Sequence, residues 1–333
     1  MMNPTSKNPA YELTPGTSVR GKWHGQTYRV IKKIGSGATG TVYLVACRQG
    51  HGALKISENG MSITSEVNVL KKFSRVQGQP LGPSLLDVDD WQAGKGDAYP
   101  FYVMEYIQGT GFFPFIRAKG MEWVPILMMQ LLGHLQFLHD NGWVFGDLKP
   151  ENTVITMNPP RLRLIDVGGT TLIGRSIKEY TEFFDRGYWG LGSRRAEPSY
   201  DLFSAAMFFV NTAYPARLTR KEGGIAQLQP LIMNHAELSP YAGVLLKALE
   251  GKYGSANEMK GDLIETAKKK EAKGGRHSFS SSPGSRTGRK SVSGKTKTKK
   301  KSPARKKTFL GHMFETVLLF ILIFVVYFLY LMV

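Results

Sequence analysis

Asp147, Lys149 and Asn152 place a carboxylate, an ammonium group and a carboxamide close together, and Asp166 adds a second carboxylate downstream. Phosphoryl transfer needs little covalent work from a protein. It needs an acceptor hydroxyl placed in line, divalent metal between nucleotide phosphates, and positive charge near the transferred group. In that scheme Asp147 accepts the hydroxyl proton and Lys149 neutralises the moving phosphoryl group. Asn152 and Asp166 supply oxygen ligands for Mg²⁺, or for Mn²⁺ in its place.

A glycine-rich stretch lies upstream, between two runs of β-forming residues at 27–31 and 41–45. Glycines at 35, 37 and 40 let backbone N–H groups approach a phosphate without a Cβ atom in the way. The stretch opens no helix, which counts against a dinucleotide-binding Rossmann unit. We therefore expect a hairpin whose turn covers phosphate groups.

These pieces, in this order, resemble the bacterial serine/threonine protein kinases of the eukaryotic (Hanks) type. The run 147–152 resembles their catalytic loop, and Asp166-Val167-Gly168 resembles their metal-binding triplet. The resemblance implies ATP as the phosphate donor, protein Ser/Thr acceptors and an α+β, bilobal fold with a small antiparallel-sheet N-lobe and a helical C-lobe. It also implies nucleotide contacts along the hairpin, at Ile34, Gly35, Ser36, Gly37, Ala38, Thr39, Gly40 and Val42.

Lys55, on a predicted strand at 52–56, resembles the kinase lysine that pairs the α- and β-phosphates. Its expected partner is a helix glutamate, and we favour Glu66 because 65–73 has helical apolar spacing. The interval from Lys55 to Glu66 is shorter than the family usually allows, so Glu58 remains an alternative. By the same resemblance, the backbone of Glu105 and Ile107 would hydrogen-bond adenine.

Residues 169–188 resemble an activation segment, in which Thr181 would touch Asp147 and Lys149. Thr170, Thr171, Ser176 and Thr181 are candidate phosphorylation sites. The family's histidine-arginine pair before the catalytic aspartate is Phe145-Gly146 here. Without that arginine, an activation-segment phosphate loses its guanidinium partner, so we expect activity to depend less on phosphorylation there.

A second departure concerns a buried ion pair of the family. The family's glutamate is missing near 186–188, and Lys252 stands where its arginine partner would be. A buried pair stripped of one member is costly, so losing both members is the cheaper route. We therefore expect altered packing at the end of the activation segment.

Charge is distributed unevenly along the 333 residues, whose formal net charge is +18. Residues 268–307 hold 16 of the 44 Lys and Arg residues and a single acid, so the rest of the chain is nearly neutral. The segment 271–308 has too little apolar content to order itself and is expected to be disordered. The single cysteine, Cys47, excludes an intrachain disulfide and suits a reducing cytosol.

The segment Thr316–Val333 contains no charged residue. At about 1.5 Å per residue, a helix of this length reaches roughly 27 Å, which is close to the hydrocarbon thickness of a bilayer. We therefore expect one C-terminal transmembrane helix. Because the flanking segment is basic, the kinase region is expected to stay in the cytoplasm, at the cell membrane.

Two ligands of the basic segment fit the residues equally well. Anionic lipid would attract it electrostatically, and duplex DNA would bind it by counterion release without base specificity. The whole layout resembles a group of DNA-responsive membrane kinases from spore-forming bacteria. That resemblance favours DNA and a role in sporulation, with self-association for phosphorylation in trans. The candidate DNA contacts are Lys295, Lys297, Lys299, Lys300, Lys301, Arg305, Lys306 and Lys307.

The predicted organisation is a polar leader at 1–22, a protein kinase domain at 23–265, a basic juxtamembrane segment at 266–308 and a membrane helix at 309–333. The alternative function is a catalytically weak pseudokinase that tethers DNA or anionic lipid at the membrane. Phe145-Gly146 and the missing glutamate favour that alternative. The joint presence of Lys55, Asp147 and Asp166, with Lys149 and Asn152, favours an active enzyme.

Overall fold

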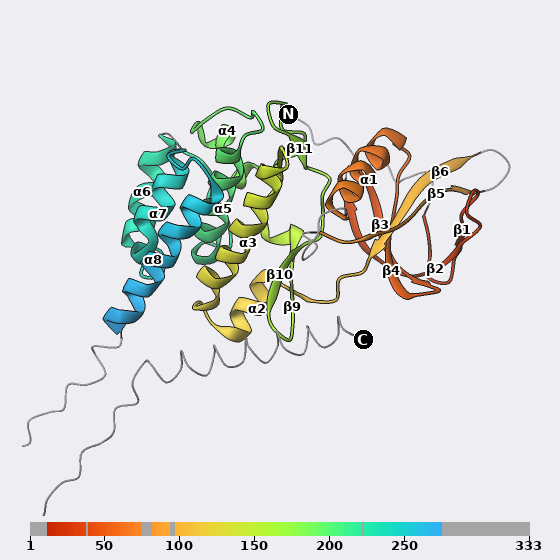
Figure 1. The fold of residues 1–333 in the computed structure, drawn as a ribbon, viewed down its shortest axis with the longest axis horizontal. Coiled ribbons are helices and arrows are strands. Elements are labelled where there is room, and N and C mark those ends of the chain that lie inside the picture. Colours follow the sequence, from red (N-terminus) through yellow and green to blue (C-terminus); the bar gives the residue numbers. More distant parts are fainter. Residues whose placement is uncertain (1–11, 38, 75–81, 94–96, 222, 275–333) are drawn as a thin grey trace, which may run out of the picture. The chain divides into compact units, whose positions relative to one another are not determined.

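The computed structural model describes residues 12–37, 39–74, 82–93, 97–221 and 223–274. All of them lie in the first of two compact units, residues 1–279. The second unit, residues 280–333, lies outside the described part of the chain. Figure 1 shows strands and one helix at one end of the first unit and a set of helices at the other end.

The N-lobe is a six-stranded antiparallel sheet. One face buries apolar and aromatic side chains that alternate along the strands, as in Val19, Tyr28, Val30 and Val45. Helix α1 (Gly60–Ser74) packs against strands of this sheet. The strands, in the spatial order β1-β2-β3-β4-β6-β5, are β1 (Ser18–Arg20), β2 (Thr27–Gly37), β3 (Gly40–Cys47), β4 (Gly50–Ile56), β6 (Ala98–Glu105) and β5 (Leu85–Gln92).

The ordered body begins earlier than the predicted boundary at residue 23. Strand β1 pairs with β2 through Val19 and Tyr28, and Val19 is fully buried. Leu13 is also buried in the same cluster. The polar composition of this stretch concealed two apolar side chains that complete the edge of the sheet.

The C-lobe is built around α5 (Pro198–Ala213), in which every residue from Tyr200 to Asn211 is buried. Burial on all sides of this kind is typical of a helix surrounded by other helices. The other helices of the described C-lobe are α2 (Phe112–Lys119), α3 (Trp123–Asp140), α4 (Arg186–Trp189), α6 (Gly224–Asn234), α7 (Ala242–Leu249) and α8 (Ala256–Gly274). Short 3₁₀ turns lie at η1 (Pro150–Asn152), η2 (Glu182–Phe184) and η3 (Ser239–Tyr241).

Short strands position the predicted catalytic residues. Strand β8 (Trp143–Val144) pairs with β11 (Thr171–Leu172) and leads into the catalytic loop. The loop ends at β9 (Thr153–Thr156), which lies between β7 (Thr110–Gly111) and β10 (Arg161–Leu164). The β9–β10 hairpin places Asp166 just beyond the end of β10.

Helix α8 continues to Gly274, past the predicted domain end at 265 and into the segment predicted to be disordered. The Ser255 hydroxyl caps it by accepting from Glu258 N at 3.2 Å. The Glu258 carboxylate accepts from Gly254 N at 2.9 Å instead of returning to Ser255.

Among the described residues no helix is long and apolar enough to cross a bilayer. The predicted membrane helix at 309–333 lies outside them.

Candidate active site

A cleft of about 610 Å³ brings the predicted nucleotide and catalytic residues together. Its walls come from the β2–β3 hairpin, from β4, from the segment after β6 and from the catalytic loop. Ala38 lies outside the described residues, and Glu66 contacts the cleft through Lys55. The predicted residues that line it are Ile34, Gly35, Ser36, Gly37, Thr39, Gly40, Val42, Lys55, Glu105, Ile107, Asp147, Lys149, Asn152 and Asp166.

The glycine-rich stretch forms the predicted hairpin, with Gly37 opposite Gly40 at its tip. Gly40 has φ +139°, and a Cβ atom there would lie 2.5 Å from the Ile56 carbonyl oxygen. Only glycine fits this approach between the hairpin and the end of β4.

Lys55 pairs with Glu66. Its Nζ atom donates to the two Glu66 carboxylate oxygens at 2.8 and 2.7 Å, and both side chains are buried. Tyr102 donates its hydroxyl to Glu66 at 2.7 Å, and burial beside this carboxylate raises the pKa of Tyr102 well above its ordinary value. The short interval works because α1 starts directly after β4, where Asn59 Oδ1 accepts from Met61 N and Ser62 N. Glu58 is exposed.

Asp201, at the start of α5, holds the backbone of the catalytic loop. Its carboxylate accepts from Phe145 N at 2.8 Å and from Gly146 N at 3.0 Å, and it is fully buried. His139 contacts the same carboxylate through Nε2 at 2.9 Å. The loop is therefore fixed to the most deeply buried helix of the C-lobe, as a preorganised site requires.

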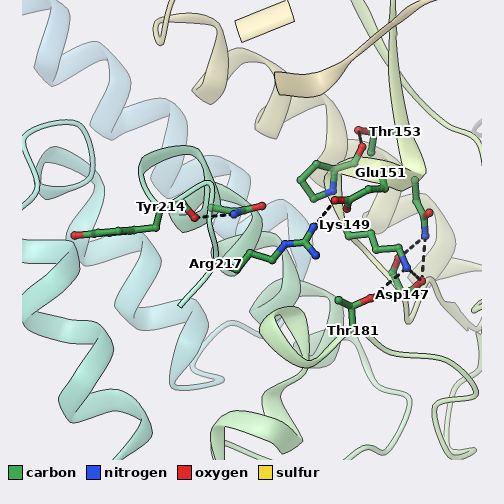
Figure 2. A network of polar contacts seen from close by, with 10 residues as sticks. Asp147, Lys149, Glu151, Thr153, Thr181, Tyr214 and Arg217 are labelled. Atoms are coloured by element: carbon green, nitrogen blue, oxygen red, sulfur yellow. Dashed lines mark hydrogen bonds and ion pairs between the residues drawn. The ribbon is translucent and has the colours of Figure 1, made fainter. Parts of the chain in front are cut away.

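The catalytic loop gathers Asp147, Lys149 and Thr181 into one hydrogen-bonded group (Figure 2). Lys149 Nζ contacts the Asp147 carboxylate and lies 3.1 Å from Thr181 Oγ1. Thr181 donates to Asp147 Oδ1 at 3.0 Å, which is the contact expected from the sequence. Asn152 Nδ2 donates to the Asp147 backbone oxygen at 2.8 Å and fixes the loop from the other side.

The oxygen atoms of Asn152 and Asp166 suit a hard divalent cation. The Asn152 amide donates through its nitrogen, which leaves its oxygen as the acceptor. Asp166 Oδ1 accepts from Gly168 N at 2.9 Å, which fixes the carboxylate at the cleft. Carboxylate and amide oxygens without imidazole or thiolate ligands are a donor set for Mg²⁺ or Mn²⁺. Bound between nucleotide phosphates, such a cation neutralises their charge.

Glu179 also lines the cleft, although it is not among the residues predicted from the sequence. Partial burial, followed by the charge of Asp166, raises the pKa of its carboxyl group. The only signal in the sequence is an acidic residue two positions before Thr181, which is too common a feature to single out.

The activation segment is held by backbone pairing. Ile177 N donates to Arg194 O at 2.9 Å, Ala196 N donates to Arg175 O at 2.8 Å, and Gly174 N donates to Ala196 O at 2.8 Å. Ile177 is buried in a cluster with Val144, Ala196 and Tyr200. Of the candidate phosphorylation sites, Ser176 is exposed and Thr181 is partly buried, whereas Thr170 and Thr171 are buried. Phosphorylation of the two buried hydroxyls would require this segment to open.

Gly146 fits the same arrangement. Its φ is +85°, and a Cβ atom there would lie 2.6 Å from the Gly169 carbonyl oxygen and 3.6 Å from Ile177 Cδ1. An arginine at this position, which the family carries, would be strained in this backbone and would require the Gly169 carbonyl to move. Its absence is therefore coupled to the close packing of the activation segment.

Two local ion pairs lie where the sequence predicts altered packing. Asp185 pairs with Arg194, and Arg186 pairs with Glu197. The sequence analysis found neither pair, because charged side chains in a loop carry no spacing signal for such a contact. Lys252 pairs with its neighbour Glu250 at 2.6 Å.

The predicted nucleic-acid contacts at 295–307 lie outside the described residues.

A two-lobed fold with a glycine-rich hairpin, a buried Lys–Glu pair and this catalytic loop defines the protein kinases. Residues 28–247 match the protein kinase domain family. The chain belongs to this family, and it is a serine/threonine protein kinase.

Individual relatives agree with this assignment. The chain is 45% identical over 332 residues to the serine/threonine-protein kinase YabT of Bacillus subtilis, covering 99% of this chain and 98% of the relative. It is 27% identical over 196 residues to a probable cAMP-dependent protein kinase catalytic subunit of Encephalitozoon cuniculi, covering 50% and 58% of the two chains. The PknI kinase domain of Mycobacterium tuberculosis has a similar fold, with a TM-score of 0.54, 20% identity, and coverage of 77% of this chain and 100% of that one.

Proposed function

We propose that Asp147 is the residue that orients and deprotonates the acceptor hydroxyl. Its carboxylate lines the cleft and is held by Thr181, Lys149 and Asn152. Lys149 stabilises negative charge on the transferred phosphoryl group, because its ammonium group lies beside the acceptor position. Lys55, fixed by Glu66, orients the other phosphates of ATP. Asn152 and Asp166 hold Mg²⁺. The single observation that carries this assignment is that one cleft is lined by Lys55, Asp147, Lys149, Asn152 and Asp166.

A phosphorylation assay with labelled ATP and Mg²⁺ tests the role assigned to Asp147. We expect Asp147→Asn to reduce phosphorylation of a protein acceptor by about 10²–10⁴-fold, the usual effect of removing a general base. Asp140→Asn is the matched control, since this aspartate lies exposed at the end of α3, where its Oδ1 accepts from Gln136 Nε2 at 2.8 Å. Equal rates for Asp147→Asn and the unmodified chain would refute the role of Asp147.

We infer that residues 316–333 anchor the kinase in the cell membrane, with its catalytic domain in the cytoplasm. We also infer that duplex DNA binds the basic segment and stimulates phosphorylation by gathering several copies. The support is the concentration of 16 basic residues at 268–307 beside a nearly neutral kinase body. A role in sporulation rests on the resemblance of the whole layout to kinases of spore-forming bacteria.

The full chain in detergent micelles, assayed with and without duplex DNA, tests the DNA proposal. We expect stimulation at low salt that disappears at high salt, because DNA binding through n basic residues falls with a log–log slope of about −0.9n. A variant with all eight basic residues at 295–307 changed to Gln should lose both the stimulation and most of the slope. Stimulation by anionic vesicles and none by DNA would identify lipid as the ligand. A phosphorylation rate that changes with neither DNA, nor anionic vesicles, nor salt would refute the DNA proposal.

A further inference from the structure

Arg217 separates two hollows that flank the catalytic group. A hollow of about 650 Å³ is lined by Arg217 and Glu151 together with Arg117 and residues of α2. A second hollow of about 340 Å³ is lined by Arg217 on one side and by Thr181 on the other. Glu151 also lines the nucleotide cleft, and Thr181 bonds to Asp147. A polypeptide whose hydroxyl reaches Asp147 and whose flanking residues occupy either hollow would contact Arg217.

The position of Arg217 is fixed by three contacts. Its guanidinium forms an ion pair with the Glu151 carboxylate and lies over the Phe184 ring, 4.9 Å from the centroid. Its backbone N–H donates to Tyr214 O at 3.0 Å. Figure 2 shows this side chain extending from its loop to Glu151, next to Lys149 and Asp147. The guanidinium is therefore presented to the acceptor side in one orientation.

The backbone of Arg217 is strained. Its φ is +58°, in the left-handed region that a residue with a long side chain seldom adopts. Strain of this kind persists where the surrounding structure imposes it, and such residues gather at ligand sites. The strain is a second observation, independent of the ion pair, that marks this position.

In the larger hollow two arginines, Arg117 and Arg217, face one carboxylate, Glu151, and this balance favours an anionic side chain on the acceptor. Glu151 would attract a cation, but its charge is neutralised by Arg217. Within the described residues, the Arg217 guanidinium forms its one hydrogen bond with Glu151. A guanidinium has five N–H donors, so donors remain for a second anion. Arg117, which is exposed, adds another positive charge to the larger hollow.

We propose that Arg217 determines substrate specificity by selecting acceptor polypeptides that carry an anionic side chain close to the Ser or Thr hydroxyl. The anion is a carboxylate of Asp or Glu, or a phosphate monoester on a residue that is already phosphorylated. This inference rests on the proposed position of the acceptor at Asp147. It adds a substrate class that the catalytic residues by themselves do not define.

A peptide panel with the full chain tests the proposal. Each peptide carries one acceptor serine in an alanine background, with Asp, phosphoserine, Ala or Arg at each flanking position in turn. Scanning every position is necessary because the smaller hollow also contains the exposed acid Glu182. We expect kcat/KM to be about tenfold higher or more with an anion than with Ala at one or more positions, as a charge-assisted hydrogen bond provides. The Asp and phosphoserine arms distinguish the two sources of the anion.

Arg217→Gly is the decisive variant. Glycine adopts φ +58° without strain, so the variant should unfold at no lower temperature than the unmodified chain. Its kcat/KM for the anionic peptides should fall to the value that the same variant shows for the Ala peptide. Arg217→Lys should retain part of the preference. Lys221→Ala is the matched control, because this substitution removes one positive charge from the same loop. Lys221 is exposed and lines neither hollow.

Two results would overturn the inference: equal kcat/KM for Asp, Ala and Arg peptides with the unmodified chain, or an anion preference that survives in Arg217→Gly. Either result would leave the kinase site itself intact. Failure of that site is recognised separately, because it would appear as unchanged peptide phosphorylation by Asp147→Asn.

Discussion

Asp185 and Arg194 form an ion pair at the end of the activation segment, with Arg194 Nη2 2.7 Å from Asp185 Oδ2. The Asp185 carboxylate is fully buried. It also accepts from Gly187 N and Tyr188 N, which caps α4, and from the Tyr200 hydroxyl at 3.0 Å. One short-range pair thus connects the activation segment to the loop before α5 and to α5 itself.

The buried carboxylate of Asp185 is expected to contribute more to stability than its partner. Asp185→Asn removes the charge from several donors at once and should lower the free energy of unfolding by about 2–3 kcal/mol. Arg194→Ala should have an effect of about 1 kcal/mol or less, because the Arg194 side chain is 42% exposed and the carboxylate keeps three other donors. Chemical denaturation of both variants measures the difference. If both variants lowered the free energy of unfolding equally, this ranking would be wrong.

The Lys55–Glu66 pair predicts a specific loss of catalysis. Glu66→Gln removes the charge that fixes Lys55, and a misplaced phosphate ligand can reduce kcat/KM by about 10²-fold. Glu58→Gln is the matched control, since Glu58 is exposed and close in sequence. Its kcat/KM for ATP should stay within about twofold of the unmodified chain. If Glu58→Gln impaired activity as much as Glu66→Gln, the observed pair would not explain the effect.

Activity should not require phosphorylation of the activation segment. Backbone pairing and the burial of Ile177 already hold it, so Ser176→Ala and treatment with a phosphatase should leave the initial rate within about twofold. Ile177→Asp, by contrast, would bury a carboxylate beside Val144 and Tyr200 and should abolish most of the activity. Initial rates of phosphorylation, measured for both variants and for the phosphatase-treated enzyme, test this prediction. A phosphatase-treated enzyme that recovers activity only after autophosphorylation would refute this prediction.

We expect His134 to cause part of the loss of folding stability of the kinase domain at acidic pH. Burial, with the nearby charges of Arg163 and Lys260, lowers the pKa of His134 from 6.5 to about 4. Between these values the unfolded chain binds the proton more tightly, so stability falls as the pH decreases from 6.5 towards 4. The loss assigned to this group is about 2 kcal/mol at pH 5.

Denaturation of the unmodified chain and of His134→Gln at pH 7 and pH 5 measures this contribution. Glutamine does not titrate, so the variant should lose less stability between the two pH values. The difference between the two proteins isolates His134 from carboxylates that also protonate in this range. If both proteins lost the same stability between pH 7 and pH 5, His134 would not contribute to the acid sensitivity.

The sequence by itself determined the parts of the site that are local. Asp147, Lys149 and Asn152 share one loop and Asp166 follows one hairpin, so residue type and spacing were sufficient to predict that they meet. The glycine-rich hairpin was predictable for the same reason, because its turn depends on backbone freedom at neighbouring positions. The basic and apolar segments near the C-terminus were recognisable from composition, and their predicted roles stay predictions.

Only the tertiary structure decided the contacts between distant residues. Spacing left Glu58 and Glu66 open, and the start of α1 directly after β4 selected Glu66. The pairing of Arg217 with Glu151 joins residues 66 positions apart, and no periodicity in either segment encodes it. The physical reason is that spacing along a chain fixes direction only within one element. Which charged groups meet, and which are desolvated, depends on how separate elements pack.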